Sequence, residues 1–542
     1  MQEKQYLVVI GVPSIKKFVF GTNRLKEIRG ASALLDHINT DETRDFLRNK
    51  AGIPETDIIF LGGGAGQFIL SVSEIDLERY LCDLERIYSE RAKGGIRLLW
   101  GWAEYSGDNY RQARRAAESM SEEKRDELPF ISCTQMHTGF VRECGSCSCI
   151  AVSLVGIDEE LEPLCDVCIE KLRFEREIKR KRSEEGAWNG FLRYLKEWKG
   201  VQTQRPGDFE TIGELCAAKR GYTAVVYADG NAMGKLIKEI DDRETYRRFS
   251  ETVDGAVKQA CYEALYDVFF QKEEPQILPA DILLLGGDDL VVYLTAESAL
   301  PFAVRAASKF NEITKQRFGA SEYGFLKEKI GEKGLTLSVG IAYGKSHTPF
   351  SILLDQAEEL LKSAKEGGSQ DESSGPYFSP AYIDFHISTS FNQINVADCR
   401  LNHLELSSKG KRKIRLYQKP YSLEDAEALL NHAQDLKNSG IPSTRLKRLG
   451  SAPALGKVNG SLECMKLYTR MPMEKRRAIW QALDRFGCNE IMPWDKKHHE
   501  RDPRLPRMPW NEKHDEYDST VLVDLMEIAA FCGTHDGVSH ET

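Results

Sequence analysis

The sequence predicts an α+β protein with two ferredoxin-like domains, a zinc-binding insert between them and a helical domain towards the C-terminus. Two stretches repeat the order βαββαβ with a tight hairpin between the central strands, which is the ferredoxin-like pattern. Two CxxC pairs lie between these stretches, and helical periodicity follows them. We expect a first ferredoxin-like domain at 1–130, a zinc module and helical linker at 131–215, a second ferredoxin-like domain at 216–375, and a linker and C-terminal helical domain at 376–542.

The first domain contains the predicted elements in the expected order. Apolar alternation predicts strands, and amphipathic spacing predicts helices, at strand 6–10, helix 28–36, strand 57–61, strand 68–72, helix 75–93 and strand 96–103. The hairpin between the central strands reads LGGGAGQF. It contains no carboxylate, so we predict no metal site in this domain.

The second domain repeats this order. The predicted elements are strand 223–228, helix 243–269, strand 281–285, strand 290–294, helix 299–318, strand 335–342 and helix 350–365. A Gly/Ser-rich break at 366–376 should close the domain. Beyond about residue 400, LEDAEALLNHAQDLKN and STVLVDLMEIAAFCG have helical spacing.

Composition excludes several classes of protein. The chain has 542 residues, 41% hydrophobic and 29% charged, and no apolar run long enough to cross a bilayer, so a membrane protein is not expected. The start, MQEKQYLVVIGVPS, alternates like a strand rather than a signal peptide, which predicts a cytoplasmic protein. The net charge of -9 argues against a chain that coats nucleic acid by bulk attraction.

The hairpin of the second domain reads LLLGGDDLVVYL and predicts the chemistry. Asp288 and Asp289 sit at its tip, and Asp229 directly follows the buried strand of TAVVYADGNAMGKL. Carboxylates on neighbouring strands can share two magnesium or manganese ions with the phosphates of a nucleotide. A polar turn is the simpler reading of GGDD alone, but the other elements in the right order favour catalysis. We call the two domains the first palm and the second palm.

Residues around these carboxylates are candidates for nucleotide binding. Backbone amides of the first loop and the glycines of the hairpin can approach a triphosphate closely, and lysines can supply charge. The candidates are Gly230, Asn231, Ala232, Gly234, Lys235, Gly286, Gly287 and Lys365. A lysine near a helix C-terminus, such as Lys365, is also favoured by the helix dipole. Residues 62–66 of the first palm either contact a second nucleotide between the palms or form a structural turn.

The cysteine segment predicts structural zinc. Cys144, Cys147, Cys165 and Cys168 have the spacing C-x2-C-x17-C-x2-C, which suits a tetrahedral site of four thiolates with no open position. Cys149 is an alternative ligand, and Cys133 and His137 are weaker ones. Buried thiols that merely pack as small hydrophobic groups are the other explanation.

Two charged segments are candidates for RNA contact. Residues 171–182 and 494–514 combine basic residues with aromatic ones, as RNA-binding surfaces often do. A solvated helix is the commoner explanation for the first segment. For the second, RNA or partner contact and a solvated surface stay open.

The ordered set ADGNAMGKL, LLLGGDDLVVYL, LTLSVGIAYG and LLKSAK resembles the palm of the large, polymerase-type subunit of type III CRISPR effector complexes, a relative of GGDEF cyclases. The opening IGVPSIKKFVFGTNRLKEIRGASALLDHI, the cysteine segment and the C-terminal helices are similar to other parts of that family. The resemblance implies synthesis of cyclic oligoadenylates from ATP, triggered when the complex with its crRNA binds target RNA. It also implies other effector subunits as partners.

The sequence departs from the family in two ways, and the product stays open. Asn231 stands where many relatives have a second acidic residue. The chain begins at the first palm without an N-terminal HD nuclease domain, and His535 and Asp536 lack partner histidines, so no DNA cleavage is expected. Nothing in the sequence excludes a product that joins ATP to S-adenosylmethionine. The alternatives are a scaffold subunit that binds crRNA and proteins without catalysis, and a free-standing cyclic dinucleotide cyclase, whose relatives usually carry glutamate at the position of Asp289.

Overall fold

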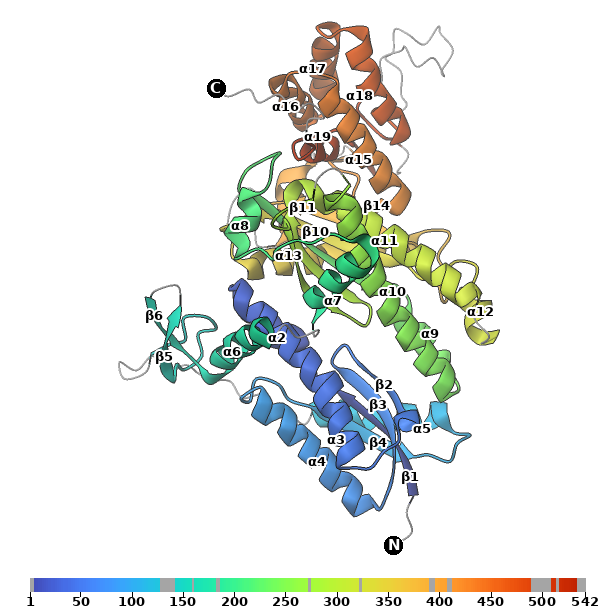
Figure 1. The fold of residues 1–542 in the computed structure, drawn as a ribbon. Coiled ribbons are helices and arrows are strands. Elements are labelled where there is room, and N and C mark those ends of the chain that lie inside the picture. The colour runs from blue at the N-terminus through green and yellow to red at the C-terminus, as the bar shows by residue number, and fades with distance from the viewer. Residues whose placement is uncertain are drawn as a thin grey trace.

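The computed structural model describes residues 4–126, 142–157, 160–181, 186–271, 274–320, 324–388, 395–406, 412–488, 508–512 and 516–533. The two palms lie next to each other, and the C-terminal helices lie beyond the second palm (Figure 1). No helix among the described residues has the length and apolar character needed to cross a bilayer.

The first palm is an antiparallel sheet of four strands in the order β2-β3-β1-β4. Its elements are β1 (Lys4–Gly11), α1 (Ile15–Phe20), α2 (Leu25–His37), α3 (Thr43–Asn49), β2 (Ile58–Gly62), β3 (Ala65–Val72), α4 (Glu74–Arg91), β4 (Leu99–Glu104) and α5 (Tyr110–Asp126). Ser73 starts α4, because its hydroxyl oxygen accepts a hydrogen bond from the amide of Asp76. The predicted βαββαβ order is confirmed, while α1, α3 and α5 were not predicted.

The second palm has the same core arrangement. Its elements are β7 (Tyr222–Gly230), α9 (Met233–Glu239), α10 (Arg243–Phe269), β8 (Ala280–Gly286), β9 (Asp289–Thr295), α11 (Ala296–Gly319), α12 (Gly324–Ile330), β10 (Leu337–Lys345) and α13 (Phe350–Gln370). The strands β11 (Tyr382–Ile387) and β14 (Tyr421–Ser422) extend the sheet to the order β14-β11-β10-β7-β9-β8. This sheet therefore continues past residue 375, where we expected the palm to end.

The predicted break at 366–376 is wrong at its start, because α13 continues to Gln370. The glycines inside it serve close packing rather than a turn. A Cβ on Gly368 would lie 2.7 Å from the carbonyl oxygen of Pro380, and one on Gly367 would lie 2.8 Å from Cγ of Pro420. Only glycine lets the chain after α13 return this close to the helix.

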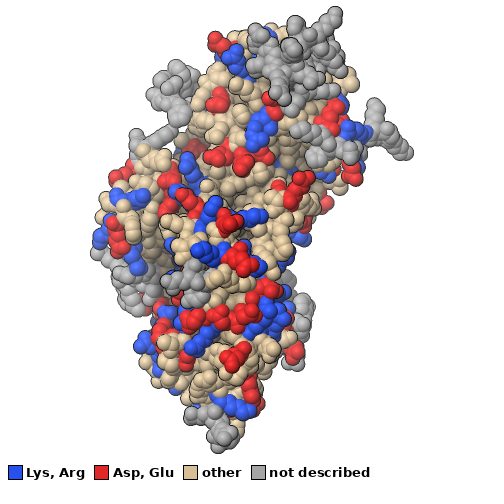
Figure 2. All heavy atoms as spheres, turned by 90° about the vertical axis from the view of Figure 1, so that its right-hand side faces the viewer, with Lys and Arg blue, Asp and Glu red and all other residues tan. Residues whose placement is uncertain are grey.

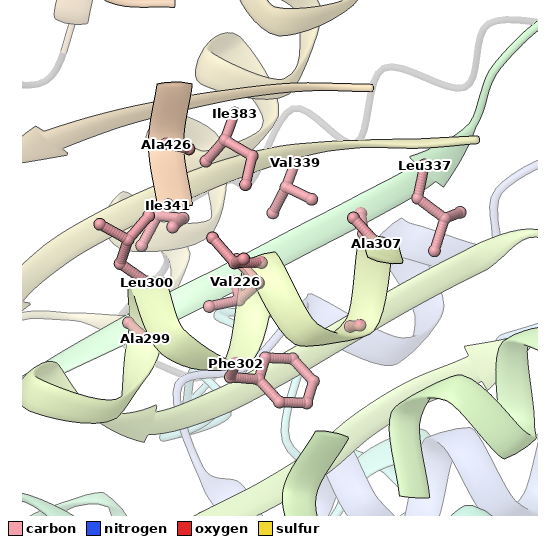
Figure 3. Packing of buried hydrophobic residues seen from close by; sticks show 14 of the residues in the cluster. Val226, Ala299, Leu300, Phe302, Ala307, Leu337, Val339, Ile341, Ile383 and Ala426 are labelled. Carbon is pink, nitrogen blue, oxygen red and sulfur yellow. The ribbon is translucent and has the colours of Figure 1, made fainter. Parts of the chain in front are cut away.

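Helices cover both faces of the second sheet. On one face, apolar residues of β7, β10 and β11 pack against α11, as Val226, Val339, Ile383 and Phe302 show in Figure 3. On the other face, the alternate residues of β7 and β9 pack against α13 and the short helix α8 (Phe209–Glu214). Because strand side chains alternate between faces, Asp229 and Asp289 both belong to the face that α13 covers.

The insert and the C-terminal part complete the predicted fold class. The insert contains β5 (Ser153–Ile157), β6 (Glu160–Leu164), α6 (Asp166–Lys181) and α7 (Ala187–Tyr194). The C-terminal part contains α14 (Val396–Cys399), β12 (Glu405–Leu406), β13 (Lys413–Arg415), α15 (Leu423–Asn438), α16 (Ser443–Ser451), α17 (Lys457–Thr469), α18 (Met473–Arg485), β15 (Tyr517–Ser519) and α19 (Leu522–Ala529). Cys133, His137, His535, Asp536 and most of 494–514 lie outside the described residues.

Acidic and basic side chains are interspersed over the face in Figure 2. This matches the moderate net charge of the chain. It gives no sign of a broad basic surface on that face.

Candidate active site

The strand register brings the three predicted aspartates together. Ala228 of β7 pairs with Leu290 of β9, and Gly286 of β8 pairs with Asp289 across the hairpin. Asp229 and Asp289 therefore end neighbouring strands. Asp288 lies beside Asp229, because a Cβ placed on the adjacent Gly230 would be 3.0 Å from the Cβ of Asp288.

The hairpin is shaped by glycine and held from α10. Gly287 has a φ of 63°, which glycine adopts at no steric cost. Its amide donates a hydrogen bond of 3.2 Å to Oδ1 of Asp254 on α10, and the other oxygen of Asp254 is 2.7 Å from Nζ of Lys258. Asp254 thus fixes the hairpin that carries the carboxylates. Sequence reasoning missed this role, because an acidic residue in an amphipathic helix is ordinary.

The carboxylates lie in an electrostatically strained environment. Burial raises the pKa of Asp288 to about 7, and the charges of Asp229 and Asp289 add to the rise. Burial and Asp229 also raise the pKa of Asp289 to about 6, against the lowering effects of Lys16 and of the Tyr227 hydroxyl. That hydroxyl donates to Oδ1 of Asp289 at 3.4 Å. Three acidic groups this close need a compensating positive charge.

Lys365 supplies one positive charge from α13. Its ammonium forms an ion pair with Asp229 and donates a 3.1 Å hydrogen bond to the carbonyl oxygen of Gly230. We predicted Lys365 as a cation for the nucleotide phosphates, and the structure places its ammonium beside Asp229. Helix α13 brings it there because the helix covers this face of the sheet.

Asn231, which we expected to bind the nucleotide, makes its hydrogen bonds within the protein. It is buried, and its side-chain amide donates to Oγ1 of Thr336 at 2.9 Å, while its backbone amide donates to the carbonyl oxygen of Thr336 at 3.0 Å. Its side chain therefore holds the end of β7 to the start of β10 rather than facing a nucleotide. Ala232 has a left-handed φ of 61° before α9, and Gly234 and Lys235 are exposed on the first turn of that helix.

Two cavities meet at the site. The carboxylate cavity, about 920 Å³, is lined by Asp229, Asp289, Tyr227 and Lys365 among others. The interpalm cavity, about 1010 Å³, is lined by Gly63 and Gly64 of the first palm and by Gly286 and Asp289 of the second. Both volumes suit a nucleotide. Gly63 and Gly64 form the turn of the first hairpin and also line the space between the palms, so both explanations of residues 62–66 remain predictions.

The two palms are joined at β8, the strand that leads into the GGDD hairpin. Asp281 of β8 is fully buried and accepts hydrogen bonds from Arg29 of α2 at 2.5 Å and from Arg205 of the linker at 2.9 and 3.0 Å. The neighbouring Gly30 lies against α6 of the insert, where a Cβ would be 1.9 Å from the carbonyl oxygen of Lys171. Helix α2 is therefore in contact with the insert and with β8 at adjacent residues.

The four predicted zinc ligands converge. One thiol sulfur from each of Cys144, Cys147, Cys165 and Cys168 lies within 4.8 Å of the others. Four sulfurs at the usual zinc distance from one centre would be separated by about 3.8 Å, so the cluster fits zinc after a small contraction. A hydrogen bond from Cys168 contributes most to lowering the pKa of Cys165 to about 5. Cys149 is exposed and outside this cluster.

The comparison with protein families decides the nature of the second palm. Residues 222–374 match the family described as Cas10/Cmr2, second palm domain. The second palm therefore matches the Cas10/Cmr2 palm domain family. This Cas10/Cmr2 palm contains all three aspartates and Lys365, so the candidate site lies wholly within the matched region.

The similarity to this family extends beyond the Cas10/Cmr2 palm. The chain is 21% identical over 426 residues to the CRISPR system single-strand-specific deoxyribonuclease Cas10/Csm1 (subtype III-A) of Streptococcus thermophilus, covering 68% of this chain and 53% of the relative. It is 22% identical over 445 residues to the protein of the same description from Thermococcus onnurineus, covering 68% and 54%. The chain is thus homologous to Cas10/Csm1 proteins and spans about half the length of these relatives.

A solved structure has the same overall fold. The crystal structure of a Csm1-Csm4 cassette in complex with cA4 matches with a TM-score of 0.54 and 15% identity, covering 97% of this chain and 70% of the other. The fold outside the Cas10/Cmr2 palm is therefore shared as well.

Proposed function

We propose that this chain is the nucleotidyltransferase subunit of a type III CRISPR effector complex and makes cyclic oligoadenylates from ATP when target RNA binds. The observation that carries the proposal is the convergence of Asp229, Asp288 and Asp289 where two nucleotide-sized cavities meet, within a Cas10/Cmr2 palm. The similar Csm1-Csm4 structure is a complex with cA4, which supports this class of product.

Asp229, Asp288 and Asp289 would hold magnesium or manganese. The donor set fits, because oxygen ligands suit these ions and because burial, together with the neighbouring aspartates, raises the pKa of Asp288 and of Asp289, so a bound cation would favour their charged forms. When bound, such an ion neutralises the leaving pyrophosphate and lowers the pKa of the attacking ribose hydroxyl.

The residues of the chain bind and orient the nucleotides. The carboxylate cavity receives the ATP that donates its nucleotidyl group, and Lys365 exchanges its ion pair with Asp229 for the phosphates of that ATP. The interpalm cavity receives the nucleotide whose hydroxyl attacks. Gly63 and Gly286 line this cavity where the two hairpins pack on each other, and neither adds a side chain to it.

The remaining parts of the chain support this reaction structurally. The four cysteines would bind one zinc ion, with no open position for catalysis, and so brace the insert. The other effector subunits, crRNA and target RNA are the proposed partners, because they are the partners of the homologous family.

A single assay tests the function. The full chain is incubated with labelled ATP and magnesium or manganese, alone and with guide RNA, partner subunits and matching target RNA, and products are identified by mass spectrometry. We expect cyclic oligoadenylates only from the complete set, and none from an Asp288→Ala, Asp289→Ala variant. A wild type that makes nothing beyond what this variant makes would rule out the enzymatic proposal.

Zinc is tested separately by metal analysis. Undamaged protein should contain about one zinc per chain. A Cys165→Ser, Cys168→Ser variant should lose it, whereas Cys149→Ser should retain it. Retention of zinc by the double variant would exclude the four-thiolate site.

A further inference from the structure

The two cavities share two lining residues among those that the structure describes, Asp289 and Lys16. Asp289 belongs to the second palm. Lys16 belongs to α1 of the first palm. The point where the cavities meet therefore combines a carboxylate from one palm with a cation from the other.

The backbone next to Lys16 is firmly held. Phe18, two residues on, is buried. Ile15 packs on the first hairpin so closely that a Cβ on Gly64 would lie 2.3 Å from Cδ1 of Ile15. The loop between β1 and α1 is also tied to this hairpin, because the amide of Val12 donates a 2.8 Å hydrogen bond to the carbonyl oxygen of Gly64. These contacts fix the base of a side chain that reaches the second palm.

The ammonium of Lys16 lies among second-palm groups of the carboxylate cavity. It is 2.8 Å from Oε1 of Glu358 on α13 and 4.8 Å from the centre of the Tyr227 ring. The ring of Tyr227 carries the hydroxyl that donates to Asp289. The positive charge of Lys16 also lowers the pKa of Asp289.

The ion pair of Lys16 is easily exchanged. The side chains of Lys16 and Glu358 are 45% and 51% exposed. An ion pair between such exposed groups contributes little to stability, so a phosphate, which offers a lysine a charge-assisted hydrogen bond of the same kind, can replace Glu358 at little cost. Glu358 thus holds Lys16 at the site without binding it tightly.

We propose that Lys16 is a phosphate-binding residue that the first palm contributes to the reaction of the second palm. This inference rests on the proposed function. Its ammonium contacts the α-phosphate of a nucleoside triphosphate at the point where the two cavities meet. Lys365 acts on the same nucleotide from α13, so the two lysines approach the phosphates from different palms.

The chemical step leaves Lys16 unchanged. The ribose hydroxyl oxygen of the nucleotide in the interpalm cavity forms a bond to the α-phosphorus of the triphosphate. The bond from that phosphorus to the oxygen bridging to the β-phosphate breaks, its electron pair leaves with pyrophosphate, and the hydroxyl proton passes to water. Lys16 stays protonated and stabilises the negative charge on the α-phosphate.

The test compares two adjacent lysines. Lys17 is exposed and lines neither cavity, so it is the matched control. In the complete complex, Lys16→Ala should lower turnover by about 10- to 100-fold and Lys17→Ala by less than about twofold, because one charge-assisted contact is lost. Lys16→Arg should recover part of the turnover, and all variants should keep the melting temperature of wild type.

Binding supplies an independent readout. Calorimetry with an ATP analogue that has a methylene bridge between the α- and β-phosphates should show weaker binding to Lys16→Ala by about 10-fold, with Lys17→Ala like wild type. Glu358→Gln removes a competitor for Lys16 and should tighten binding by about 2- to 5-fold.

The outcomes separate the two proposals. If wild type makes no product but Lys16→Ala still binds the analogue more weakly than Lys17→Ala, the phosphate contact stands and the proposed function fails. If Lys16→Ala equals Lys17→Ala in turnover and in binding, the role of Lys16 is wrong while the proposed function stands. A loss of turnover accompanied by a lower melting temperature and no recovery with Lys16→Arg would assign Lys16 a purely structural role.

Discussion

The two palms have the same hairpin geometry but different residues at its tip. In the first, Gly62 pairs with Ala65 across a two-residue turn, and in the second Gly286 pairs with Asp289 in the same way. The strand registers make three positions equivalent: Gly11, Gly64 and Ala65 in the first palm correspond to Asp229, Asp288 and Asp289 in the second. The shared fold therefore does not require carboxylates at these positions.

The hairpins also face each other. A Cβ on Gly63 would lie 3.4 Å from the amide nitrogen of Gly287. The first hairpin has no side chain at Gly63 or Gly64, so it can pack against the second without adding charge. The comparison shows that the second palm has carboxylates at positions where the first palm has glycine and alanine, on hairpins that share one geometry.

The largest expected effect is on product formation, and it should differ between equivalent positions of the two hairpins. Asp289→Asn should lower product formation by about 1,000-fold or more, because it removes a charged ligand at the reacting centre. Ala65→Asn, at the equivalent exposed position of the first palm, should change it by less than about twofold. Equal losses in the quantified ATP assay would show that both hairpins are catalytic.

The next largest effect is a loss of stability when the contact between the palms is broken. Asp281→Asn should lower the free energy of unfolding by about 3 kcal/mol, because two arginines lose their buried carboxylate. The matched control is Asp57→Asn, which removes a partly exposed ion pair between the palms, 3.3 Å from Arg243, and should cost less than about 1 kcal/mol. Urea unfolding measures both. A cost for Asp281→Asn no greater than that of the control would show that the palms are joined elsewhere.

Exchanging the hairpin residues should have a smaller effect. Gly64→Asp should destabilise the protein by about 1–3 kcal/mol, because Gly64 has a φ of 76° and its Cβ would collide with Ile15. The reverse change, Asp288→Gly, should not destabilise the metal-free protein. Denaturation curves of the two variants decide this, and a stable Gly64→Asp protein would mean that the first hairpin can accept a carboxylate.

The smallest expected effect is the pH dependence of the free energy of unfolding of the metal-free protein. The pKa of Asp288 is raised to about 7, so the folded chain binds this proton more tightly than the unfolded chain. The free energy of unfolding should therefore fall as the pH rises from about 4 to about 7 and then level off. Asp288→Asn should remove about 1–2 kcal/mol of this fall, whereas Ala65→Asn should leave it intact. Identical pH profiles of unfolding free energy for wild type and Asp288→Asn would contradict the raised pKa of Asp288.

The sequence predicted the parts of the site that depend on local pattern. Helix α10 has the predicted bounds, Arg243–Phe269, because its amphipathic spacing is long and regular. The strand-terminal Asp229, the GGDD hairpin and the two CxxC pairs also follow from short-range signals. Two palms and a C-terminal helical part are confirmed in the fold.

Other features depend on contacts between distant segments. The extension of α13 through Gly367 and Gly368 exists because residues 379–382 and Pro420 pack on it. The hydrogen bond from Asn231 to Thr336, and the roles of Asp254 and Lys16, arise where separate elements meet. Helix α1 has only six residues, too few for a periodic signal. No local pattern could identify these residues.

The adjacent contacts of Arg29 and Gly30 on α2 have a mechanical consequence. The backbone of α6 packs directly on Gly30, while Arg29 donates a hydrogen bond to Asp281 of β8, the strand that ends in the GGDD hairpin. Because α2 contacts α6 and β8 within one helical turn, a displacement of α6 should also move β8. A protein that displaced the insert would therefore also displace β8 and its GGDD hairpin without contacting a nucleotide.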